Sequence, residues 1–226
     1  MAAGRRRAAS PGDGEQAGTG GVAGAVLAGG PSRRMGRDKA TLPLGGSALG
    51  RLAIEALAAV ADPVALVAPT GHPANRLLAA GVGAAPPGRP LRLLAVADPG
   101  RGPLAALAAA LHALPAEHLL VVAGDHPGLR VELLRQLVTM RAEASALACR
   151  RGGRVEPLVA LYRREPALAA AEARLAGRDH SLRGLLADLG ARLLDESEWR
   201  PFDPDGRSFV DLDDPAALAA WLQGQR

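Results

Sequence analysis

A glycine-rich stretch near the N-terminus carries residues whose types and spacing could bind a phosphate. It runs from Leu27 to Lys39 and reads Leu-Ala-Gly-Gly-Pro-Ser-Arg-Arg-Met-Gly-Arg-Asp-Lys. The paired glycines leave backbone N–H groups open to an anion, and three arginines and a lysine follow to neutralise its charge. Because Lys39 is the only lysine among 27 basic residues, we expect its compact ammonium group to act as a point charge on a phosphate.

The spacing of this stretch differs from the commonest phosphate-binding loops. Gly30, Gly36 and Lys39 do not fit the pattern G-x-x-x-x-G-K-[ST], and the stretch contains no G-x-G-x-x-G. Its surroundings still indicate a ligand site, because an apolar run over residues 22–27 predicts a buried strand before it. Apolar periodicity over residues 47–60 predicts a helix after it, and α/β folds place ligands at such strand ends.

Three aspartates follow other predicted strands and suggest a metal. Asp98, Asp125 and Asp213 would meet at the same edge if these strands are parallel. Mg²⁺ is typically held by one or two carboxylates together with phosphate oxygens. A nucleoside triphosphate with magnesium fits this set, and Lys39, Arg34 and the glycine amides would then nearly complete a phosphoryl-transfer site. The alternatives are that Asp125 is a turn residue and that Asp213 caps the last helix.

The alternation of strands and helices predicts an α/β fold: a Rossmann-like, doubly wound, mostly parallel sheet with helices on both faces, in a single domain. The segment 157–162 is expected to be antiparallel, because the turn before it is too short for a crossover helix. We expect residues 195–207 to be irregular and 209–215 to return as a strand end. The other expected strands are 63–68, 91–96, 117–123, 145–149 and 191–194, and the other expected helices are 72–80, 103–114, 130–143, 165–175, 181–189 and a last helix reaching residue 222.

Composition bounds the remaining possibilities. A chain of 226 residues suits one domain, residues 21–226, after a disordered basic leader, residues 1–20. An aromatic content of 2% argues against a nucleic-acid stacking surface. The single cysteine, Cys149, argues against a disulfide framework or a cysteine-based metal site. Without a membrane-spanning apolar stretch or the apolar core of a secretion signal, we expect a cytoplasmic protein that binds no membrane.

Several other polar and aromatic residues have a plain structural reading. His126 is expected to be structural or solvent-facing, and Tyr162 is expected to lie in the core. Arg178, His180 and Arg183 could line a pocket for an anionic acceptor, but a solvated helix face is the favoured interpretation.

The chain resembles the molybdenum cofactor guanylyltransferases, the nucleotidyltransferases that join GMP to molybdopterin. The resemblance covers nearly everything after residue 21. The opening signature is specific, and the later pieces are individually weak but come in the family's order. The matching pieces are Leu27-Ala28-Gly29-Gly30-x-Ser32-x-Arg34-Met35-Gly36-x-Asp38-Lys39, Gly102-Pro103-Leu104-Ala105, Gly124-Asp125-x-Pro127, Glu156-Pro157-Leu158 to Tyr162, and Asp211-x-Asp213-x-Pro215.

The resemblance implies a reaction and its partners. The phosphate of molybdopterin attacks the α-phosphorus of GTP and pyrophosphate leaves, with Mg²⁺ as the cofactor. Residues of about 21–130 would bind the nucleotide and residues of about 131–226 the acceptor, and molybdoenzymes or other cofactor-biosynthesis proteins are implied as further partners. The implied nucleotide-binding residues are Leu27, Ala28, Gly29, Gly30, Ser32, Arg34, Lys39, Asp98 and Gly102; Arg34, Lys39 and Asp125 are implied as catalytic, and Asp125 and Asp213 as metal ligands.

The sequence departs from the family pattern at two places. The family commonly has asparagine in the loop after the second strand, where this chain reads Ala68-Pro69-Thr70, and many members have asparagine where Asp213 stands. A related enzyme that uses CTP or another phosphorylated acceptor is the nearest alternative, although such cytidylyltransferases tend to have Ala-Ala-Gly at residues 28–30. A sugar-1-phosphate nucleotidyltransferase and a catalytically silent nucleotide-binding protein are the more distant alternatives.

Overall fold

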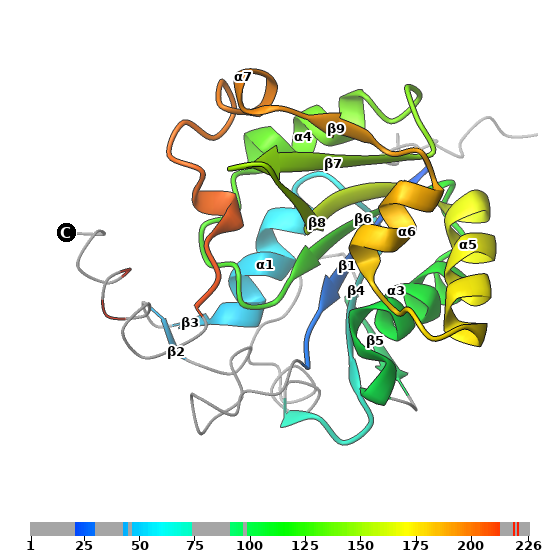
Figure 1. Cartoon of the computed structure of the whole chain (residues 1–226). Coiled ribbons are helices and arrows are strands. Elements are labelled where there is room, and N and C mark those ends of the chain that lie inside the picture. Colours follow the sequence, from blue (N-terminus) through cyan, green and yellow to red (C-terminus); the bar gives the residue numbers. More distant parts are fainter. Residues whose placement is uncertain are drawn as a thin grey trace, which may run out of the picture.

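The computed structural model describes residues 21–29, 43–44, 47–73, 91–96, 99–212, 219 and 221. These residues form a seven-stranded sheet in the order β5-β4-β1-β6-β8-β7-β9, with helices on both faces (Figure 1). The predicted α/β class with a mostly parallel sheet is therefore confirmed. The leader, residues 1–20, lies outside the described residues.

The parallel part of the sheet is built from the first half of the chain. β1 is buried along its whole length and pairs in parallel with β4 on one side and β6 on the other. This position explains its unbroken apolar run, since helices cover both faces of a parallel sheet. The strands are β1 (Val22–Leu27), β4 (Val64–Pro69), β5 (Leu91–Val96) and β6 (His118–Ala123).

The second half of the chain adds a mixed extension. The expected antiparallel strand is confirmed as β8 (Arg154–Arg163), which is antiparallel to both β6 and β7 (Ala146–Arg151). Gly152 and Gly153 make the tight turn between β7 and β8 with φ angles of 52° and 75°. β9 (Arg192–Leu194) then pairs in parallel with β7.

Two apolar layers cover the two faces of the sheet. One contains residues of α1 (Leu49–Ala58), α4 (Val131–Thr139) and α7 (Glu196–Trp199). The other contains residues of α3 (Gly102–Ala113), α5 (Arg164–Ala176) and α6 (Leu182–Asp188).

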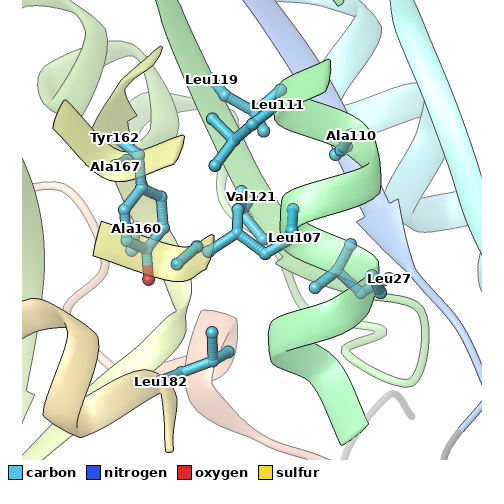
Figure 2. Packing of buried hydrophobic residues seen from close by; sticks show 14 of the residues in the cluster. Leu27, Leu107, Ala110, Leu111, Leu119, Val121, Ala160, Tyr162, Ala167 and Leu182 are labelled. Carbon is cyan, nitrogen blue, oxygen red and sulfur yellow. The ribbon is translucent and has the colours of Figure 1, made fainter. Parts of the chain in front are cut away.

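The second layer shows how an aliphatic core is completed with few aromatic residues. Figure 2 shows Leu107 and Leu111 of α3 among side chains of β6, β8 and α5. Tyr162 lies in the core as expected, and its hydroxyl donates a hydrogen bond of 3.1 Å to the carbonyl of Pro157. Burial raises the pKa of this phenol well above its usual value.

Two helix boundaries differ clearly from the prediction. The helix expected from Ser47 begins at Leu49, because Ser47 and Ala48 form β3, which pairs with β2 (Pro43–Leu44). The helix expected to reach residue 143 ends at Thr139. Two other predicted helices are largely outside the described residues. Of the helix expected at residues 72–80 the structure describes only the first two residues, and of the last helix only Ala219 and Trp221, both helical.

The prediction that residues 195–207 are irregular is only partly right, and residues 209–212 of the strand end expected at 209–215 are not a strand. Residues 213–215 lie outside the described residues. The segment 195–212 contains α7, which opens with a capping box of Asp195 and Glu198, and a 3-10 turn, η3 (Arg207–Phe209). The fully buried carboxylate of Asp203 sets this turn, since it accepts hydrogen bonds from the amides of Arg207 (3.0 Å) and Ser208 (2.8 Å). Throughout the described part of the chain, no helix combines the length and apolar character needed to cross a bilayer.

Candidate nucleotide-transfer site

The chain leaves β1 through a loop that only glycine can begin. The amide of Ala28 still bonds to the carbonyl of Val67 on β4, at 2.8 Å, and Gly29 then takes a φ of +118°. A Cβ atom on Gly29 would overlap Cδ of Pro69 and lie 2.8 Å from its Cγ. Glycine is therefore required at this position both by the backbone angle and by the packing.

The end of β6 lies directly beside this loop. Leu27 pairs with Ala123, and the amide of Gly124 donates a hydrogen bond of 2.9 Å to the carbonyl of Leu27. The half-buried Asp125 follows at once, so its carboxylate belongs to the same edge of the sheet as Gly29. A phosphate cradle beginning at Gly29 and a carboxylate beside it are what a metal-bound nucleotide needs.

The C-terminal segment returns to the same place. The amide of Leu212 donates a hydrogen bond of 3.3 Å to the carbonyl of Asp125, which joins the chain just before Asp213 to the end of β6. Gly128 packs under Trp221, whose Cη2 atom would lie 2.5 Å from a Cβ atom on Gly128. The segment from Asp125 to Gly128 is thus in contact with the C-terminal part of the chain at both of its ends.

The ends of β4 and β5 form the far side of the site. The amide of Thr70 donates a hydrogen bond of 3.2 Å to the carbonyl of Val96, which ties the loop after β4 to the end of β5. The short turn η2 (Pro99–Arg101) then leads into α3, where Gly102 has a φ of +63° and open space around the position of a Cβ atom. A helix that begins with a glycine lets an anion or a polar ligand group approach the backbone closely.

Several predicted site residues cannot be compared with the structure. Those that the structure describes, Leu27, Ala28, Gly29, Gly102 and Asp125, come from strand ends or the helix start at one edge of the sheet. Their roles in binding remain predictions. Gly30, Ser32, Arg34, Lys39, Asp98 and Asp213 lie outside the described residues.

The carboxylate of Asp125 suits a metal that keeps most of its ligands outside the protein. Among the residues that the structure describes, no three His, Cys, Asp or Glu side chains gather as a metal cage. Mg²⁺ bound by one or two carboxylates, substrate phosphate oxygens and water requires no such cage. Asp125 fits this mode of binding.

Charged residues also gather at the start of β8, where no site residue was predicted. The carboxylate of Glu156 is half-buried, and this burial raises its pKa although Arg183 and Arg151 act in the opposite direction. Arg183 donates a hydrogen bond of 2.9 Å from Nε to the carbonyl of Val155. Glu156 was named from the sequence only as part of the piece Glu156-Pro157-Leu158. Its proximity to Arg183 of α6 depends on the fold and has no local signal.

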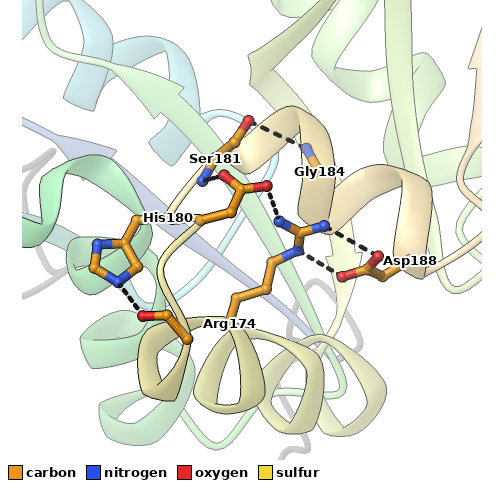
Figure 3. A network of polar contacts seen from close by, with 7 residues as sticks. Arg174, His180, Ser181, Gly184 and Asp188 are labelled. Atoms are coloured by element: carbon orange, nitrogen blue, oxygen red, sulfur yellow. Dashed lines mark hydrogen bonds and ion pairs between the residues drawn. The ribbon is translucent and has the colours of Figure 1, made fainter.

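A polar network fixes α6, which carries Arg183. The guanidinium of Arg174 on α5 contacts the carboxylates of Asp179 and Asp188, and the hydroxyl of Ser181 accepts a hydrogen bond from the amide of Gly184 (Figure 3). The bond from Arg174 lowers the pKa of Asp179. This network joins the end of α5 to both ends of α6.

Two other reactive side chains are buried away from solvent. Cys149 is fully buried on β7, and desolvation raises the pKa of its thiol to about 12, so the thiolate is not available at neutral pH. His126 is almost completely buried, in agreement with the expected structural role rather than a solvent-facing one.

Comparison with known proteins gives a consistent result. A family model described as the MobA-like NTP transferase domain matches residues 24–193. A protein of Mycobacterium avium named probable molybdenum cofactor guanylyltransferase is 34% identical over 211 residues, which cover 90% of this chain and 96% of the relative. The molybdenum cofactor guanylyltransferase of Syntrophotalea carbinolica is 30% identical over 198 residues, which cover 87% and 88%.

A solved structure agrees at the level of the fold. The crystal structure of molybdopterin-guanine dinucleotide biosynthesis protein A from Archaeoglobus fulgidus superposes with a TM-score of 0.72 at 23% identity. The match covers 89% of this chain and 97% of that one. The two chains therefore have the same fold over almost their whole length.

Proposed function

This chain belongs to the molybdenum cofactor guanylyltransferase family of MobA-like NTP transferases, and we propose that it transfers GMP from GTP to the phosphate of molybdopterin. One structural observation supports this most directly. The hydrogen bond from the amide of Gly124 to the carbonyl of Leu27 sets Asp125 beside the loop that begins at Gly29. A phosphate-binding loop and a metal-binding carboxylate thus have a common edge.

The proposed reaction needs positioning and charge neutralisation more than a protein nucleophile. Gly29 and Gly30 would present backbone N–H groups to the triphosphate, while Arg34 and Lys39 would neutralise its charge. An oxygen of the acceptor phosphate forms a bond to the α-phosphorus of GTP, and the bond from that phosphorus to the bridging oxygen breaks, so pyrophosphate leaves.

The metal would belong to the same step. Asp125 and Asp213 would hold Mg²⁺, which supplies charge neutralisation to the phosphates when bound. Leu27, Ala28 and Ser32 would complete the loop around the phosphates, and the pieces around Asp98 and Gly102 would receive the nucleoside.

Nucleotide preference gives a direct test. In a thermal-shift panel of GTP, CTP, ATP and UTP with Mg²⁺, GTP should give the largest stabilisation, since a ligand that binds only the folded state raises its stability. With GTP and molybdopterin the enzyme should release pyrophosphate. A clear preference for CTP would replace this proposal by a cytidylyltransferase, and no response to any nucleotide would refute it.

A variant pair tests the metal-binding residue. Asp125→Asn should lose at least roughly a hundredfold in pyrophosphate release while it remains folded, because the amide removes the charge that holds the metal. Asp205→Asn is the matched control, since Asp205 is an exposed aspartate in the loop before η3. Equal turnover in the two variants would remove Asp125 from the site.

A further inference from the structure

Glu156 lies at the same edge of the sheet as Asp125, on the side of the antiparallel strands. The pairing of β6 with β8 ends at Val122 and Val159, and continuing that antiparallel register would bring Asp125 opposite Glu156. On its other side β8 pairs with β7, and a shift of register between Ala148 and Cys149 pairs Glu156 with Cys149. Glu156 therefore flanks the proposed transfer centre from the second half of the chain.

The carboxylate of Glu156 has charged neighbours and unused acceptor capacity. Arg183, Arg151 and Arg154 stabilise its negative charge, whereas its burial and the nearby Asp211 oppose it. Within the described part of the chain, no hydrogen bond or ion pair ends on its two oxygens. An ionised carboxylate offers about four lone-pair sites, so this group can accept several hydrogen bonds from a ligand.

Arg183 is held so that it supports this carboxylate. Its Nε donates to the carbonyl of Val155, the residue before Glu156, and the helix that carries it is tied to α5 by the Arg174 network (Figure 3). Its two Nη groups have no partner among the described residues. Arg183 thus holds the start of β8 and provides a positive charge that favours the ionised form of Glu156, against the effect of burial.

The acceptor of the proposed reaction contains a group that matches this carboxylate. A pterin has an aminopyrimidinone edge on which the ring N3–H and the 2-amino group point in parallel, as the two N–H groups of a guanidinium do. Carboxylates accept such a pair of hydrogen bonds bidentately, and the charge makes both bonds stronger.

We propose that Glu156 accepts two hydrogen bonds from the N3–H and 2-amino groups of the acceptor's pterin and thereby selects the acceptor. This inference rests on the proposed transfer to molybdopterin. Glu156 is a specificity-determining residue in this arrangement, and Arg183 is a positioning residue.

Binding of two small probes tests the inference without turnover. The probes are 6-hydroxymethylpterin monophosphate and the corresponding lumazine, in which an oxo group replaces the 2-amino group, each titrated in the presence of GTP and Mg²⁺ and followed by fluorescence. Wild-type protein should bind the pterin roughly tenfold or more tightly than the lumazine. Glu156→Gln should bind the pterin roughly 10- to 100-fold more weakly and lose this preference, because its NH₂ group meets another donor.

Two further variants separate recognition from folding. Glu156→Asp keeps the carboxylate on a shorter stem, so it should bind both probes more weakly and still prefer the pterin. Glu165→Gln makes the same chemical change on an exposed glutamate just beyond the other end of β8, and should behave as wild type.

The outcomes distinguish this inference from the function on which it rests. If Glu156→Gln keeps the full pterin preference while wild type binds GTP, Glu156 does not recognise the acceptor and the transferase proposal stands. If wild-type protein binds neither GTP nor the pterin, both are wrong. An unchanged thermal shift with GTP in Glu156→Gln, together with the lost pterin preference, supports the inference.

Discussion

The replacement of Gly29 by alanine should destabilise the protein at the start of the loop after β1. A φ of +118° is sparsely populated for residues with a side chain and costs about 1–3 kcal/mol. The new Cβ would also overlap the ring of Pro69, which is closed onto its own backbone and cannot rotate away. Together we expect a loss of about 2–4 kcal/mol in the free energy of unfolding.

Calorimetry and nucleotide titration measure this loss. A change of this size lowers the melting temperature of a chain of this length by about 5–15 °C. If the substitution changes the conformation of the loop and leaves β1 and β4 in place, the melting temperature should change less. The affinity for GTP with Mg²⁺ should then fall by roughly 10- to 100-fold. Gly190→Ala is the control, since its φ of +57° is also positive but a Cβ atom there would meet nothing within 4 Å.

A double variant isolates the contact with Pro69. Pro69→Ala removes both ring atoms that the new Cβ would meet, so it should restore about 1–2 kcal/mol of the stability lost by Gly29→Ala. Strictly additive effects in the double variant, or a Gly29→Ala protein with the melting temperature and GTP affinity of wild type, would refute this reasoning.

Three further measurements test other parts of the structure. Asp203→Ala should lower the free energy of unfolding by about 3–5 kcal/mol, measured by urea titration, because two amides lose their buried acceptor; a loss below 1 kcal/mol would contradict this. Gly184→Ala should cost about 1 kcal/mol or less in the same titration, since the new Cβ meets only the movable guanidinium of Arg174, whose ion pairs are exposed; a larger loss would show that the network is structural. Cys149 should not react with a thiol reagent at pH 8 until urea unfolds the protein, and fast labelling of the native state would contradict its burial.

The raised pKa of the Cys149 thiol predicts how the free energy of unfolding changes with pH. Its pKa rises from 9.0 to about 12 on folding, so the folded state holds the proton more tightly than the unfolded state. The contribution to stability is complete below pH 9 and falls by about 1.4 kcal/mol for each pH unit between 9 and 12. Cys149→Ala should therefore show a smaller loss of stability over this range, and an identical pH dependence would contradict the assignment.

Much of the fold could be predicted because its signals are local. The apolar run at residues 22–27 and the short turn before β8 depend on neighbouring residues, and both predictions are confirmed. α7 was missed although its capping box, Asp195 with Glu198, is a local signal that could have been recognised. The start of α1 was misplaced because Ser47 serves as well in a strand pair as at a helix N-terminus.

Some features of the candidate site could likewise be predicted from the sequence, and others depend on the tertiary structure. The sequence alone determined the fold class and the loop that begins at Gly29, because strand periodicity and glycine spacing are properties of adjacent residues. The tertiary structure alone decided that Pro69 excludes a side chain at Gly29 and that Asp203 is buried. It also decided that Glu156 lies near Arg183 of α6. These features depend on contacts between residues far apart in the chain, and the order of the residues does not reveal which of them meet until the sheet has set their register.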